Sequence, residues 1–543
     1  MKSRVARRAA IGAAVLVVSG LASDARAGGL FLPGSGAVST SRAGAAVAST
    51  EGGEALGLNP AGLAKTDGTT ITLSMAIIDY AMTFQRRGHY DYIDNVDLPY
   101  EGARYPLVEN VAKPDLAIGR YQPIPVMAIT TDLGGAVPKL RLAAGLYAPN
   151  SYPFRDMCTH LATGGCHKYV FNGDPDVPPS PARYDIVKED AVLFMPTLAA
   201  SYRVLPNFDV GARFGVGVAH VASTIHVWGA AGNVTEDVGG DGVLSLAADD
   251  HFVPGYGVGF AFRPTPTIEL AGNYSSELTI AAQGDAHSVL GDRAGATGVA
   301  VTVVPVPDEF ARCAPGGTME NQKGCVTLEV PRTATIGGRY KFLDPTGHEH
   351  GDVELDVGWE NWGAQRVSDF LVVIDAEIQT TGGGGFTLKD NIVRHGFKDV
   401  FNARLGGSWK FPVGASSVIA RGGIGYDTAA AKPGWYRADI DGAARTTLTA
   451  GAGYRASRFE LDVGAGVVLE GASNNPGTCN PISALPTMRG CNGDGIETPL
   501  ASRAGLDPIN PLNTPEQQLQ SPVNQGQFKS HYVMFMLGAS TWF

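Results

Sequence analysis

The chain has 543 residues and a formal net charge of -11; 71 residues are glycine, and only 17% are charged. A net acidic surface repels phosphate groups, and no basic patch interleaved with aromatic residues occurs, so this balance argues against nucleic-acid binding. The length would suffice for several domains, yet no break in composition divides the chain.

The first 27 residues have the features of an export signal. Basic residues precede an apolar or small-residue run at 9–21, and Ala25-Arg26-Ala27 matches a cleavage site. We therefore expect residues 1–27 to be a signal peptide. A retained membrane anchor is the alternative, but it needs an apolar core of roughly 20 residues. No later stretch is apolar enough for a membrane-spanning helix, which leaves a soluble exported protein or an outer-membrane barrel.

Residues 28–68 do not alternate between apolar and polar positions, and they are rich in small residues. They include Asn59-Pro60-Ala61, in which the Asn-Pro pair favours a turn. We expect this stretch to lie outside a barrel or to pack inside its lumen, because it cannot form a strand that faces lipid.

From residue 69 to residue 543 one unit recurs, in which about ten residues alternate before a turn. Between Phe208 and Val218, apolar side chains fall on one face, whereas Asp209, Arg213 and glycines fall on the other. This pattern suits a membrane barrel with an apolar outer face and a polar lumen. A soluble sheet with one wet face has the same period and is the alternative.

Two further features favour the membrane barrel. Tight turns such as 205–207 and 456–457 alternate with long segments such as 151–190 and 471–527, as periplasmic turns alternate with outer loops. The last strand alternates up to Phe543 and resembles the signal read by the barrel-assembly machinery, an expected partner. We count about fourteen strands of the length that crosses a bilayer. They include strands at 251–263 and 267–282, and none is predicted between residues 282 and 330 or between residues 362 and 399.

The six cysteines fall into three local pairs within the long segments. We expect three disulfides in an oxidising compartment, although six cysteines allow 15 connectivities. Metal binding is the weaker interpretation, because no pair has C-x-x-C spacing. The pairs are Cys158 with Cys166, Cys313 with Cys325, and Cys479 with Cys491.

Several stretches resemble the FadL/TodX family of outer-membrane transporters for long-chain fatty acids and other hydrophobic compounds. They are the start Gly29–Gly34, the Arg42–Ala46 stretch, Asn59–Leu63 and, further along, residues 145–149, 264–276, 331–340 and 356–362. The three cysteine pairs and the long outer loops depart from the family's pattern.

The resemblance implies an all-β fold, a fourteen-stranded antiparallel barrel at 69–543 with a hatch at 28–68 that plugs its lumen. Asn59, Pro60 and Ala61 match the hatch motif. Family members bind hydrophobic molecules in the lumen and release them through a lateral opening near an inward kink of the third strand. Pro149 and Asn150 lie where that strand would meet its loop. No cofactor is implied.

Two inward arginines, Arg213 and Arg404, are candidates for holding the headgroup of a fatty acid, because arginine binds carboxylates bidentately. The favoured alternative is that both pair with lumen carboxylates such as Asp209, Glu354 or Asp356.

Other classes of function remain open at this stage. No G-x-S-x-G or H-E-x-x-H motif occurs, and no catalytic residue is predicted. A general diffusion porin and a surface adhesin that uses the cysteine-bearing loops are the alternatives to a transporter. Fatty acids, aromatic hydrocarbons and other lipids all fit the sequence as substrates.

Overall fold

The computed structural model describes residues 29–90, 92, 97–162, 164–171, 173, 176–227, 237–294, 301–381, 383–388, 390–432, 435–475 and 526–543. The predicted signal peptide and the Cys479–Cys491 pair lie outside these residues. None of the described helices is long and apolar enough to cross a membrane. The helices are α2 (Ala37–Thr40), η1 (Gly52–Leu56), η2 (Pro60–Lys65), η3 (Leu133–Gly135), η4 (Val238–Gly240), η5 (Asp308–Phe310) and α3 (Gln365–Ser368).

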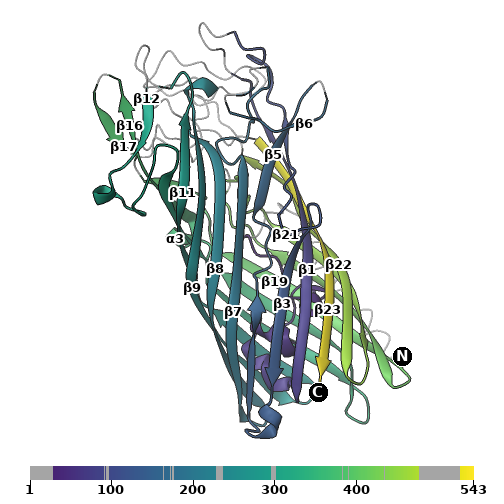
Figure 1. The fold of residues 1–543 in the computed structure, drawn as a ribbon. Coiled ribbons are helices and arrows are strands. Elements are labelled where there is room, and N and C mark those ends of the chain that lie inside the picture. Colours follow the sequence, from purple (N-terminus) through teal and green to yellow (C-terminus); the bar gives the residue numbers. More distant parts are fainter. Residues whose placement is uncertain are drawn as a thin grey trace.

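The described strands form a closed antiparallel barrel of 14 strands, as predicted. The elements named below are more numerous, because several wall strands consist of two elements and others lie in the long connections. Closure is explicit because β1 pairs with β3 on one side and with the last strand, β23, on the other. Long connections gather at one end and short turns at the other (Figure 1). The strands are β1 (Thr69–Arg86), β2 (Leu107–Asn110), β3 (Gln122–Thr131), β4 (Leu140–Tyr147), β5 (Phe154–His160), β6 (Cys166–His167), β7 (Lys188–Leu205), β8 (Phe208–Val227), β9 (Gly242–Thr265), β10 (Ile268–Ser275), β11 (Leu278–Leu290), β12 (Val301–Pro305), β13 (Gln322–Val330), β14 (Thr333–Leu343), β15 (Glu349–Glu360), β16 (Asp369–Thr380), β17 (Gly385–Thr387), β18 (Asn391–Arg394), β19 (Val400–Val413), β20 (Ser416–Asp427), β21 (Arg445–Arg455), β22 (Phe459–Asn475) and β23 (Gly526–Trp542).

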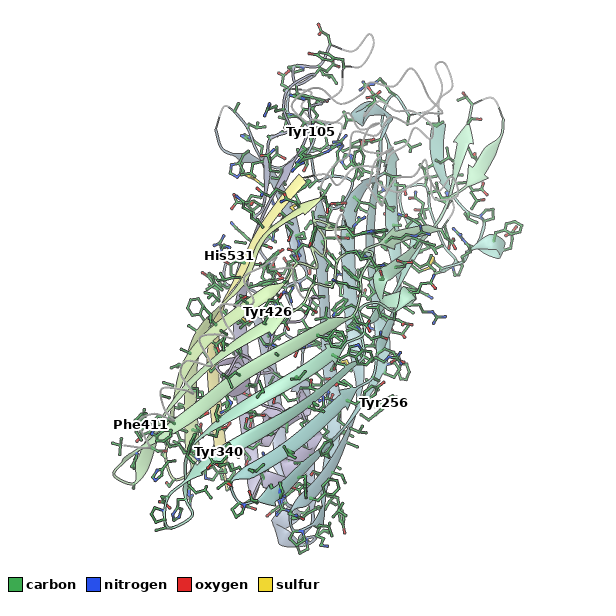
Figure 2. The ribbon with its side chains drawn as sticks, turned by 180° about the vertical axis from the view of Figure 1, so that it is seen from behind. Tyr105, Tyr256, Tyr340, Phe411, Tyr426 and His531 are labelled. Carbon is green, nitrogen blue, oxygen red and sulfur yellow. A yellow bond between two sulfur atoms is a disulfide. The ribbon has the colours of Figure 1, made fainter. Side chains whose placement is uncertain are left out.

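The period-two pattern sorts side chains between the lipid face and the lumen. In β8, Phe214 is 55% exposed on the outer face, whereas Asp209 is fully buried on the inner face. In β15, Leu355 is exposed and Glu354 is buried in the same way. Large outer-face side chains are also visible in Figure 2, where Tyr256, Tyr340 and Phe411 are labelled. The alternation therefore separates the side chains that face lipid from those that face the lumen.

Several strands are longer or more divided than alternation predicts. The strand expected at 251–263 begins at Gly242 in β9, and the single strand expected at 267–282 is split into β10 and β11. Strands β13 and β16 were missed. These extensions lie at the long-connection end, where neither face needs to meet lipid and the alternation that identifies a spanning strand is relaxed.

The second and third strands of the wall are each interrupted. The second consists of β3 and β2, which pair with β1 at Thr69–Ile78 and Thr83–Gln85 respectively. The third consists of β4 and β5, separated by residues 148–153. Pro149 and Pro153 have no backbone N–H to donate, which explains why pairing stops there. The wall is therefore discontinuous at mid-height beside β1.

Two of the three predicted cysteine pairs form the expected local disulfides. Cys158 of β5 joins Cys166 of β6, and Cys313 joins Cys325 of β13. Both lie at the long-connection end, so each closes an outer loop.

Candidate functional site

Residues 29–68, called the N-terminal segment below, lie inside the barrel, with their short helices in its lower half (Figure 1). The N-terminal segment packs closely against the wall at positions where glycines of the wall strands face it. A Cβ added at Gly211 would lie 2.3 Å from the backbone nitrogen of Ala61, and one added at Gly423 would lie 2.2 Å from the carbonyl carbon of Arg42. Only glycine permits such close backbone approach. Part of the high glycine content thus serves packing inside the lumen.

Carboxylates of β15 hold the N-terminal segment against the wall. Arg42 donates to both oxygens of Asp352, at 2.9 and 2.7 Å, and to Glu354 at 3.0 Å. Glu354 also accepts the backbone N–H of Ala48, and Asp356 accepts those of Ala46 and Val47. Charge-assisted hydrogen bonds of this kind are stronger than neutral ones. The acidic positions of one wall strand therefore fix one stretch of the segment.

The Asn59-Pro60-Ala61 motif is buried at a junction between the N-terminal segment and the wall. Asn59 caps η2 by accepting the Ala61 backbone N–H at 3.1 Å, and Pro60 occupies the first helical position. The Asn59 amide nitrogen donates to the carbonyl oxygens of Val47 at 2.9 Å and Phe260 at 3.1 Å. Because Asn59 has no exposed surface, the motif is not a simple surface turn.

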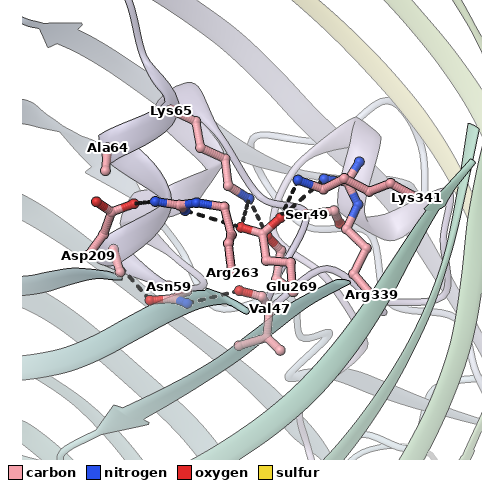
Figure 3. Close-up of polar contacts among 12 residues, drawn as sticks. Val47, Ser49, Asn59, Ala64, Lys65, Asp209, Arg263, Glu269, Arg339 and Lys341 are labelled. Atoms are coloured by element: carbon pink, nitrogen blue, oxygen red, sulfur yellow. Dashed lines mark hydrogen bonds and ion pairs between the residues drawn. The ribbon is translucent and has the colours of Figure 1, made fainter. Parts of the chain in front are cut away.

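A second group of ion pairs joins the N-terminal segment to the wall at Glu269 of β10, whose carboxylate is buried (Figure 3). Lys65 of the segment lies 3.0 Å from one oxygen, and Lys341 of β14 lies 2.9 Å from the other. Arg339 approaches the same carboxylate at 3.4 Å. The carboxylate of Glu269 therefore forms ion pairs both with the N-terminal segment and with the neighbouring strand of the wall.

The interruption of the third strand touches the N-terminal segment directly. The carbonyl oxygen of Asn150 accepts the backbone N–H of Leu32 at 2.7 Å, and its side-chain amide donates to the carbonyl oxygen of Pro33 at 3.2 Å. Asn150 is buried. The break in the wall and the beginning of the segment are thus one contact region.

Residues 111–121 cover the discontinuity, and sequence analysis missed them. Asp79 occupies an outward position of β1, following exposed Leu73 along the same face, and it is buried beneath Arg120, 3.0 Å away. The Tyr152 hydroxyl donates to the Arg120 carbonyl oxygen at 2.6 Å. An acidic residue in the lipid-facing register is the signal that could have revealed this cover.

Three cavities follow one another through the lumen. The outer cavity, about 200 Å³, is almost entirely apolar, and the inner cavity, about 210 Å³, adjoins it. Phe31, Ala148 and Pro149 line both. The lower cavity, about 400 Å³, opens among charged groups near the short turns and shares no described lining residue with the other two. Apolar lining of the outer cavity comes from Leu30, Phe194, Leu244, Leu246, Leu328 and Phe370, among others.

The two candidate headgroup arginines both line the inner cavity but differ in their partners. Arg404 forms an ion pair with Asp427 at 2.8 Å. Arg213 donates to the carbonyl oxygens of Leu56 and Leu58 and to the Ser275 hydroxyl, and no carboxylate among the described residues contacts it. The positive charge of Arg213 is therefore matched only by neutral acceptors.

One group of described residues has the spacing of metal ligands, at the outer end of the barrel. Glu109, His160 and Cys166 bring their ligand atoms within 4.8 Å of one another. The sulfur of Cys166 is bonded to Cys158, however, and a disulfide sulfur is not the thiolate that binds metal. Two ligands remain, which is short of a zinc site.

Comparison with known proteins agrees with the fold and extends it to a family. Residues 18–474 match the family model described as outer membrane protein transport protein (OMPP1/FadL/TodX). A search of curated protein sequences finds no match.

Solved structures share this architecture at low sequence identity. A FadL homologue from Pseudomonas aeruginosa has a TM-score of 0.63 at 15% identity, covering 95% of this chain and 100% of its own. The toluene transporter TodX from Pseudomonas putida has a TM-score of 0.55 at 14% identity, covering 95% and 100%. The toluene transporter TbuX from Ralstonia pickettii has a TM-score of 0.54 at 14% identity, covering 94% and 99%. With the closed barrel and its internal segment, the match over most of the chain shows that this protein belongs to the OMPP1/FadL/TodX family of outer-membrane transport proteins.

Proposed function

We propose that the protein carries hydrophobic compounds, long-chain fatty acids or aromatic hydrocarbons, across the outer membrane. The observation that carries this proposal is the apolar outer cavity on the long-connection side of the N-terminal segment. Ligand sites of this kind are concave, mostly apolar and furnished with few polar groups. Among related folds, TbuX and TodX are toluene transporters, which supports small hydrocarbons as one substrate class.

The N-terminal segment acts as the hatch in this proposal, and the interrupted third strand acts as the exit. The lower cavity has no described lining residue in common with the outer and inner cavities, so the segment stands between a ligand and the periplasmic end. Asn150 joins the break to Leu32 and Pro33. A ligand that displaces this contact would alter the hatch and the exit together, provided that it binds the two arrangements with different affinity.

A fatty acid requires a partner for its carboxylate, and Arg213 is the better of the two candidates. Its guanidinium meets only neutral acceptors, whereas Arg404 already pairs with Asp427. A fatty acid would therefore direct its head to the inner cavity and leave its chain in the outer cavity. A hydrocarbon needs the outer cavity alone.

Uptake by cells tests the proposal with a matched pair of variants. Leu328→Asp introduces a charge into the outer cavity, and Met319→Asp introduces the same charge on an exposed loop. We expect L328D to take up radiolabelled toluene and oleate poorly and M319D to match the wild type, with both assembled as heat-modifiable barrels. Unimpaired uptake by L328D, or steady porin-like conductance of the wild type in planar bilayers, would contradict the proposal.

Deletion of residues 28–68 after the signal peptide tests the hatch separately. The deleted barrel should leak small polar solutes that the wild type excludes. Equal leakage would remove the hatch from the mechanism.

A further inference from the structure

The outer cavity is mostly apolar, but acidic residues gather at one end of it. Asp185, Glu189 and Asp439 line this end, together with Arg437. Arg155, the cross-strand partner of Glu189 between β5 and β7, lies behind it. Three carboxyl groups thus face two guanidinium groups, so this end already matches its own positive charges and offers carboxyl oxygens to a hydrogen-bond donor.

Arg437 is already held by two of these carboxyl groups. Its Nη2 lies 3.5 Å from Asp185 and its Nε lies 3.2 Å from Asp439. Asp439 also lies 3.0 Å from His395, which is buried behind it. Burial raises the pKa of Asp185 to about 6 in spite of Arg437. A ligand carboxylate would have to compete with these two internal carboxyl groups for Arg437.

Arg155 is also occupied, but by neutral acceptors. It donates to the carbonyl oxygens of Ala438, Tyr152 and Phe154, and its guanidinium lies 4.4 Å over the ring of Tyr80. None of these hydrogen bonds reaches Glu189. The acidic side chain opposite Arg155 is therefore left without its expected partner.

The side chain of Glu189 makes no hydrogen bond and no ion pair with any described residue. Its Oε2 is enclosed by protein, whereas the residue as a whole is only partly buried and lines the cavity. Native proteins rarely leave a carboxyl group without a hydrogen-bond partner, so the carboxyl oxygen that remains accessible from the cavity is a position for a ligand or a water molecule. Whether ionised or protonated, the group keeps an oxygen that accepts a hydrogen bond.

We propose that the outer cavity selects apolar molecules that carry a hydroxyl group, with Glu189 accepting the hydroxyl hydrogen and the apolar walls enclosing the body. This inference rests on the proposed function and narrows its substrate class. A hydrogen bond to a carboxyl group that otherwise lacks a partner predicts that a hydroxylated ligand binds roughly tenfold tighter than its hydrocarbon parent. A ligand carboxylate of equal size gains no free cation at this end, because Arg437 is already paired with Asp185 and Asp439.

Equilibrium dialysis of the full-length protein in lipid nanodiscs, corrected with empty nanodiscs, tests this selection. The probes are toluene, p-cresol and p-toluate, which share one ring and differ in a single substituent. We expect p-cresol to bind about tenfold tighter than toluene and p-toluate to bind weakest. In Glu189→Met the preference for p-cresol over toluene should disappear, whereas Glu309→Met, in the exposed helix η5, should keep it.

The outcomes separate the two proposals. Absence of binding for all three probes would overturn the proposed function, whereas equal binding of p-cresol and toluene would overturn only the hydroxyl selection. Binding of p-toluate as tight as that of p-cresol, or an unchanged preference in E189M, would also overturn it. If E189M fails to assemble, the order of the three probes on the wild type decides.

Discussion

Arg42 provides the sharpest test of how the N-terminal segment is held. Its guanidinium is 2% exposed and contacts Asp352 and Glu354, which belong to the wall. Breaking a buried ion pair by removing one partner costs about 3–5 kcal/mol. Asp352 keeps Arg339 at 2.8 Å, and Glu354 keeps the backbone N–H of Ala48. We therefore take the lower value, about 3 kcal/mol, for Arg42→Met.

That loss falls on contacts between the segment and the wall, so it shifts the balance toward a displaced segment. At about 1.4 kcal/mol for each factor of ten, the displaced population should rise about 10²-fold. Bilayer conductance and leakage of polar antibiotics into cells measure that population, and limited proteolysis detects the displaced segment itself.

Arg339→Met is the matched control, because Arg339 also contacts Asp352 but belongs to the wall. This variant should lower the unfolding temperature of the barrel without raising conductance. If R42M conducts no more than the wild type, or if R339M conducts as much as R42M, the segment is not held by the pairs formed by Arg42.

Three further predictions concern individual contacts. Asn59→Ala removes the cap of η2 and the tie to Phe260, and it should lower the free energy of unfolding by about 1–2 kcal/mol in urea titrations of the refolded barrel. Asp79→Asn removes the charge that holds Arg120, so residues 111–121 should be cleaved faster by trypsin; unchanged cleavage would mean that this ion pair does not hold the cover. Replacing Cys313 and Cys325 by serine should destabilise their outer loop by about 2–4 kcal/mol, seen as faster proteolysis of the loop, and leave toluene uptake unchanged.

The alternation in the sequence predicted the barrel and its faces because lipid and lumen impose opposite requirements on successive residues. Phe214 and Asp209 fall on the expected sides for this reason. The same pattern failed for β13 and β16, which extend the wall beyond the region where lipid imposes alternation. Two local disulfides were predictable from spacing, since residues so close in the chain meet wherever the loop folds back.

The candidate site was only partly accessible from the sequence. The Asn59 motif and the proline-bearing break at 148–153 are local features, and a single sequence displays them. The partners of Arg213 and Arg404 are not local. Asp427 pairs with Arg404 from a neighbouring strand, whereas no described carboxylate reaches Arg213.

By itself, the sequence determined which side chains face lipid and which face the lumen, because that choice depends only on the parity of position along a strand. Tertiary structure alone decided how the lumen is filled. The neighbours of Arg42, Asp79 and Glu189 depend on strand register and on the path of the chain through the barrel, which bring together residues from tens to hundreds of positions apart. A carboxyl group that lacks a partner in a mostly apolar cavity is a property of the assembled interior. Other segments of the chain form the cavity around it and decide whether a cation or a donor lies within reach.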